Sequence, residues 1–79
     1  MSDEVVLLQS PLLYRLVRDR SGALTIEVVV GGIAMSAVRV RLNEQEMAAY
    51  AREGQAFADR LAKAIMADPS FGGRAVDVP

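Results

Sequence analysis

Apolar and polar residues alternate most regularly between residues 23 and 30, and this pattern predicts a β-strand. Thr25 and Glu27 take polar positions on one face. The other face is entirely apolar and consists of Leu24, Ile26, Val28 and Val30. Because only one face is uniformly apolar, we expect an antiparallel sheet with one face on a core and the other toward solvent.

Residues 12–19 alternate in a similar way, and the short separation from the next segment predicts a β-hairpin. The turn is Arg20-Ser21-Gly22, in which glycine can take the left-handed position of a bulge. A three-residue turn places Leu16 opposite Ile26, whereas a two-residue turn would place it opposite Glu27. The side-chain pattern therefore favours the three-residue turn.

A third strand is predicted from about Met35 to Leu42, where valines alternate with arginines. Gly31-Gly32 marks the reversal before it. Two registers remain open for this strand, one with Ala37 and one with Arg39 opposite Glu27.

A helix is predicted over residues 43–67. Asn43 is a good N-cap and Glu46 stands three residues later, where the acid of a capping box belongs. Asp68-Pro69 ends the helix, because the residue before proline is disfavoured in the α conformation. The apolar stripe, at spacings of three and four, is Met47, Tyr50, Gly54, Phe57, Leu61 and Ile65. So long a helix must overhang the sheet, cross it diagonally, or bend near Gly54.

The two ends of the chain are harder to assign. Residues 5–9 and residues 74–78 can each form a short strand, and the sequence does not decide either case. The expected fold is α+β, a three- or four-stranded antiparallel β-meander with one long C-terminal helix packed across one face. The expected organisation is a single domain over 1–79, comprising an N-terminal segment 1–11, the meander 12–42, the helix 43–67 and a tail 68–79.

The composition excludes several classes of protein but does not identify a function. The 79 residues are 52% hydrophobic and 24% charged, with a net charge of −1, as in an ordinary globular domain. The acidic N-terminus does not resemble a signal peptide, and no apolar run approaches a membrane span, so we expect a cytoplasmic protein without membrane contact. The scarcity of lysine and the abundance of alanine hint at a bacterial source with a GC-rich genome.

The residue types needed for common catalytic and metal sites are missing. The sequence contains neither histidine nor cysteine, which removes the commonest general base, the usual metal ligands and any disulfide. The helix carboxylates scatter over a polar side, which indicates a solvated surface. We therefore expect no catalytic residues, no cofactor, no metal and no enzymatic activity.

Three arginines form the most suggestive polar group. Arg15, Arg39 and Arg41 should share the sheet face away from the helix, with Glu27 among them. One interpretation is a contact for a nucleic-acid backbone or another anionic ligand, and the other is a solvated face with cross-strand ion pairs. No aromatic residue alternates with these arginines, which disfavours recognition of single-stranded nucleic acid.

The same sheet face carries an apolar group near the Gly-Gly turn, where regular alternation is lost. Its members are Leu13, Val17, Val29, Ile33 and Met35. Contiguous apolar residues on a face expected to meet solvent indicate either a contact surface or coverage by one end of the chain. A chain of this length gains stability from association, which favours a homodimer through this group.

Together these observations predict a small non-enzymatic binding or accessory protein that acts through protein–protein contacts as a homodimer. Its other protein partner is not identified by the sequence. Binding of nucleic acid or an anionic ligand by Arg15, Arg39 and Arg41 is the alternative, and a steep salt dependence of binding would distinguish it.

Overall fold

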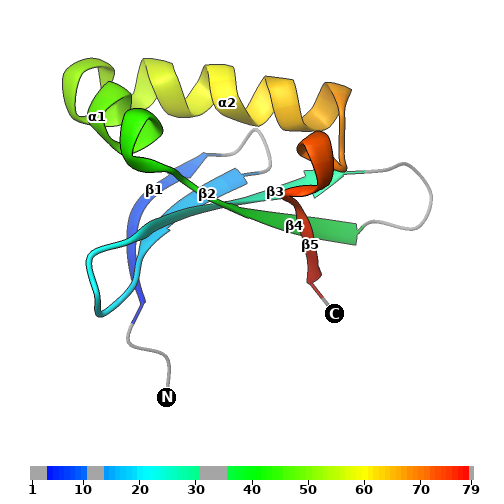
Figure 1. Ribbon diagram of the computed structural model, residues 1–79, viewed down its shortest axis with the longest axis horizontal. Coiled ribbons are helices and arrows are strands. Elements are labelled where there is room, and N and C mark those ends of the chain that lie inside the picture. The colour runs from blue at the N-terminus through cyan, green and yellow to red at the C-terminus, as the bar shows by residue number, and fades with distance from the viewer. Residues whose placement is uncertain (1–3, 11–13, 31–35, 79) are drawn as a thin grey trace.

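The computed structural model describes residues 4–10, 14–30 and 36–78 and has an α+β architecture, with helices on one face of a sheet (Figure 1). The strands are β1 (Val5–Ser10), β2 (Tyr14–Arg18), β3 (Leu24–Val30), β4 (Ser36–Arg41) and β5 (Val76–Val78). The helices are α1 (Glu44–Glu53), α2 (Gln55–Ala67) and the short 3₁₀-helix η1 (Phe71–Gly73).

The sheet is a meander in which each strand pairs antiparallel with the next, in the order β1-β2-β3-β4-β5. The α+β class and the antiparallel meander are thus as predicted. The sheet has five strands instead of three or four, because both undecided ends of the chain form strands. The helical segment lies between β4 and β5, so β5 returns to the sheet beside β4 (Figure 1).

The first hairpin has the predicted three-residue turn. The Asp19 amide donates to the Ala23 carbonyl over 3.0 Å, and Gly22 has a φ of 90°, which favours glycine. The Asp19 carboxylate also accepts hydrogen bonds from the Ser21 amide and hydroxyl. Leu16 lies opposite Ile26 as expected, so turn length and side-chain pattern agree on the register.

The register of β4 was open between two alternatives, and the structure has Arg39 opposite Glu27. Val38 and Val40 then lie opposite Val28 and Ile26, and all four side chains face the helices as part of the core. The alternative register differs by two residues and would keep the valines on the core face as well, which is why alternation alone left both open; the observed register also places Arg39 beside Glu27 on the other face.

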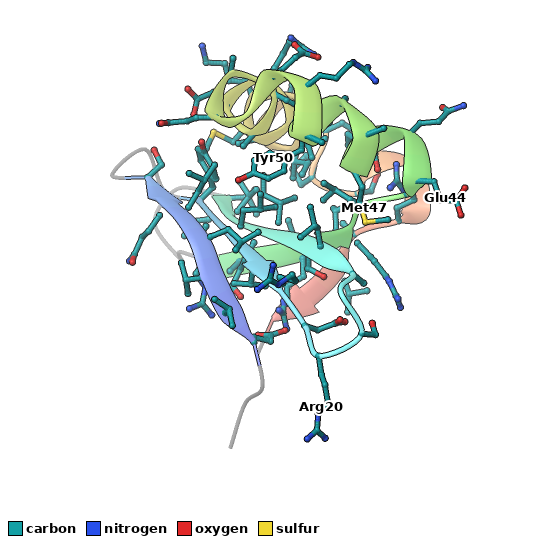
Figure 2. All side chains as sticks on the ribbon, turned by 90° about the vertical axis from the view of Figure 1, so that its left-hand side faces the viewer. Arg20, Glu44, Met47 and Tyr50 are labelled. Carbon is teal, nitrogen blue, oxygen red and sulfur yellow. The ribbon has the colours of Figure 1, made fainter. Side chains whose placement is uncertain are left out.

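The core lies between the inner sheet face and α2. Ile26, Val28, Val40 and Ile65 are completely buried. Figure 2 shows Met47 and Tyr50 projecting from α1 toward the sheet, where both pack on the core without being fully buried. The buried core residues are Tyr14, Leu16, Leu24, Ile26, Val28, Val30, Val38, Val40, Leu42, Ala58, Leu61, Ala62 and Ile65.

The helical segment begins as predicted. The Asn43 side chain accepts from the Glu46 amide, and the Glu46 carboxylate accepts from the Asn43 amide, both over 2.8 Å. This capping box satisfies amides that the first helical turn leaves without partners. The segment also ends as predicted, with Asp68 as the C-cap of α2.

The prediction of one long helix is wrong, because Gly54 divides the segment into α1 and α2. Gly54 has φ 63° and ψ −135°, which no right-handed helix contains. A straight helix over residues 44–67 would be about 36 Å long, whereas the longest dimension of the molecule is 34 Å. The bend keeps both apolar faces over the sheet, which is the third of the geometries that the sequence left open.

Gly54→Ala is expected to lower the free energy of unfolding by about 1–3 kcal/mol, because an L-residue is strained in this conformation. No atom outside its immediate neighbours lies within 4 Å of the position of an added Cβ, so the loss would come from the backbone alone. A synthetic chain with D-alanine at position 54 is the matched control, since the mirror-image residue accepts this φ and ψ. Urea unfolding should show the loss for the L-residue only, and equal losses for both would contradict this account.

Candidate functional site

The sheet face away from the helices, here called the outer face, carries the arginines singled out in the sequence. Alternation along β2, β3 and β4 turns Arg15, Glu27 and Arg39 toward this face, because their neighbours enter the core on the other side. The two registers place Arg15 and Arg39 on either side of Glu27. The register predicted from the three-residue turn thus also makes Arg15 and Glu27 cross-strand neighbours.

Glu27 interacts with both arginines. Its Oε2 lies 3.3 Å from Nη2 of Arg15 and 3.6 Å from Nε of Arg39. The Glu27 side chain is 19% exposed, whereas those of Arg15 and Arg39 are 43% and 32% exposed. A half-buried carboxylate between two partly solvated guanidinium groups is stabilised by both of them, more than an exposed pair would be.

Glu4 adds a second carboxylate, which the sequence did not indicate. Its Oε2 accepts from Nη2 of Arg39 over 2.5 Å, although Arg39 lies on β4 and β1 is three strands away in the sheet order. The contact requires a strongly coiled sheet, and Figure 1 shows the start of β1 and the end of β5 turned away from the helices. No local sequence signal connects positions 35 residues apart.

These four residues, which we call the ionic network, balance in formal charge. The network consists of Glu4, Arg15, Glu27 and Arg39. Nε of Arg15 and Nε of Arg39 are buried and have no hydrogen-bond acceptor among the described residues, and the 3.6 Å approach to Glu27 is an ion pair without a hydrogen bond. The charges of these four side chains thus cancel, and two of their guanidinium N–H groups have no acceptor among the described residues.

Arg41 is exposed and stands apart from this network. It lies opposite Thr25, two positions along β4 from Arg39. The pKa of the nearby Asp19 carboxyl is lowered, chiefly by the hydrogen bond from the Ser21 hydroxyl and, to a smaller extent, by the charge of Arg41. The three predicted arginines therefore share a face, but only two of them converge.

The structure describes only two of the five residues of the predicted apolar group, Val17 and Val29. Val17 is 1% exposed between Val6 on β1 and Thr25 on β3, so the protomer itself already covers it. Val29 is half-buried on β3. Leu13, Ile33 and Met35 lie outside the described residues. Val6, the neighbour of Val17, belongs to β1, whose existence as a strand the sequence left undecided.

Exposed large aliphatic side chains gather instead on the edge strands. Val5 and Val6 of β1 are 49% and 45% exposed, and Val76 of β5 is 65% exposed. Met66, on α2, is the remaining one at 38% within the described part of the chain. Three of these four residues therefore lie on the edge strands of the sheet, where a strand of another chain could pair.

The segment that leads into β5 is held by Arg74. Its guanidinium donates to both carboxylate oxygens of Glu46, over 3.1 and 2.6 Å, and to the Arg41 carbonyl over 2.9 Å. It also lies over the Phe71 ring, 5.2 Å from the centroid. The hydrogen bonds from Arg74 lower the pKa of Glu46. Arg74 therefore connects the start of β5 to α1 and β4, and its charge is paired with Glu46 within the protomer.

Within residues 4–10, 14–30 and 36–78, no cluster of three or more acidic side chains has the geometry to hold a metal ion. No helix in the same ranges is both long enough and apolar enough to cross a membrane.

Comparison of the chain with protein-family models, with curated proteins and with solved structures finds no match.

Proposed function

We propose that this chain is a small non-enzymatic binding protein of the cytoplasm, which acts through protein–protein contacts as a homodimer. The observation that carries the proposal is the position of the exposed aliphatic side chains. Val5, Val6 and Val76 lie on the two edge strands and not scattered over the helices. Apolar side chains beside unpaired strand edges are typical of surfaces that bind other chains.

The ionic network favours a protein contact over nucleic-acid binding. Two of the three outer-face arginines already interact with Glu27 and Glu4, so a phosphate would have to displace a carboxylate from each contact. Nucleic-acid sites instead present uncompensated positive charge over a continuous surface. A neutral network with solvated margins matches the polar rim of a protein interface more closely.

Sedimentation equilibrium over a range of protein concentrations, at low and at high salt, tests this proposal. We expect a reversible monomer–dimer equilibrium whose constant changes little with salt, because apolar burial and backbone pairing carry no net charge. A chain that stays monomeric up to high micromolar concentration would refute the homodimer. Binding of an oligonucleotide with a steep salt dependence would favour the alternative at the arginines.

A further inference from the structure

β1 differs from the other edge of the sheet in its capacity to accept a strand. It is six residues long, Val-Val-Leu-Leu-Gln-Ser, without a charged residue, glycine or proline. β5 at the opposite edge has three residues and includes Asp77. Short strands and charged residues are the usual protection of sheet edges, and β5 has both. β1 lacks both, and among the described residues no strand pairs with its other side.

The register identifies the backbone groups on the open edge of β1. The Leu24 carbonyl accepts from the Leu42 amide, so the backbone of Leu24 is directed to the β4 side and away from β2. Antiparallel pairs alternate between bonded and non-bonded positions, so Arg18, opposite Leu24, directs its backbone toward β1. Along β2, alternation directs the backbone of both Arg18 and Leu16 toward β1. Their partners Val5 and Leu8 are therefore the residues of β1 that bond to β2. The backbone groups of Val6 and Gln9 are thereby directed outward.

We propose that β1 pairs antiparallel with β1 of a second copy of this chain, so that the sheet continues through the homodimer. The inference rests on the proposed function and specifies its interface. A two-fold axis perpendicular to the sheet would keep the helices of both copies on one side and join the two outer faces. The occupant is a second copy because the strand is uncharged along its whole length, and no like charges oppose each other when it meets itself.

The bulge in β1 limits this pairing without preventing it. The register shifts between Val6 and Leu8, and such a bulge twists an edge strand and shortens its regular portion. Val5 and Val6 are each about half exposed, and they would lose contact with water when the edges join. The dimer would expose only β5 as an edge on each side, so the assembly would close at two copies and not extend into a fibre.

Gln9→Pro tests the interface because proline removes the outward N–H of position 9 and leaves the bonded positions to β2 in place. Gln9→Thr is the matched control, since it keeps the N–H and favours a strand. Sedimentation equilibrium should show the dissociation constant of the dimer raised by about tenfold or more for Gln9→Pro, because each of the two copies loses one outward ladder hydrogen bond. Gln9→Thr should dimerise like the original chain.

Hydrogen exchange of the original chain gives a second readout that does not depend on folding of the proline variant. The amides of Val6 and Gln9 should gain protection as protein concentration rises, while the amide of Leu8, bonded within the protomer, should change little. A dimer in which Val6 and Gln9 stay unprotected and Gln9→Pro changes nothing would overturn the edge pairing but leave the homodimer intact. A monomer at every concentration would overturn both.

Discussion

Replacing Ile65 by alanine is expected to lower the free energy of unfolding by about 2–5 kcal/mol, because the site loses buried methyl and methylene groups and gains a cavity. Ile65 is completely buried where α2 meets the inner sheet face. Small domains have a total stability of about 5–15 kcal/mol, so the variant would keep only part of it. Urea denaturation followed by circular dichroism, at a concentration where the chain is monomeric, measures the difference.

Met66→Ala is the matched control on the next residue of α2. Met66 is 38% exposed, so its truncation should cost less than about 1 kcal/mol. The contrast between adjacent positions tests the orientation of the helix and separates it from any general effect on helix propensity. Similar losses at both positions would show that α2 does not present Ile65 to the sheet.

The first hairpin was predictable because two independent local signals agree. Turn length and side-chain alternation both place Leu16 opposite Ile26, and any slip by one residue would expose apolar groups. The helix start was predictable for a similar reason, since Asn43 and Glu46 satisfy each other within one turn. Features decided by neighbouring residues were thus accessible from the sequence.

The break at Gly54 and the strand at β5 depend on tertiary structure. The apolar stripe continues through Gly54 at regular spacing. The predicted helix and strand lengths left an overhang, a diagonal crossing or a bend open, and only the packed structure selects the bend. β5 has three residues and is held in place by Arg74, whose partners Glu46 and Arg41 are far away in the sequence. No local pattern encodes contacts of this kind.

In the candidate site, too, the features set by local sequence were predictable and those set by tertiary structure were not. Alternation placed Arg15, Glu27 and Arg39 on one face, and the turn brought Arg15 and Glu27 together. Glu4 could not be assigned, because its contact with Arg39 depends on coiling of the whole sheet. Val17 satisfies the same alternation yet is buried, and its neighbour Val6 lies on β1, a strand that the sequence left undecided.

Tyr14 is expected to make the stability of the protein depend on alkaline pH. The residue is 4% exposed, and its hydroxyl donates to the Asp59 carboxylate, which links β2 to α2. Burial, and then the hydrogen bond and the charge of Asp59, raise the pKa of Tyr14 from 10.0 to about 12. The folded state therefore holds the phenolic proton more tightly than the unfolded state does.

The sign of the effect follows from this difference in proton affinity. Below pH 10 both states keep the proton, and the contribution of Tyr14 to stability is fully present. Between about pH 10 and 12 the unfolded state loses its proton first, so the free energy of unfolding should fall by roughly 2–3 kcal/mol, since two pKa units correspond to that amount. Urea unfolding at increasing pH, with phenolate absorbance of the folded protein, measures both quantities.

Tyr14→Phe separates this contribution from every other group that titrates in the same range. The variant should lose about 1–2 kcal/mol at neutral pH, because the hydroxyl–carboxylate hydrogen bond is removed. The difference in the free energy of unfolding between the two proteins should then shrink as the pH approaches 12, and vanish or change sign there. The reason is that the unfolded original chain releases the phenolic proton at a lower pH than the folded chain does. Parallel stability curves across that range would show that Tyr14 is not held by burial and Asp59.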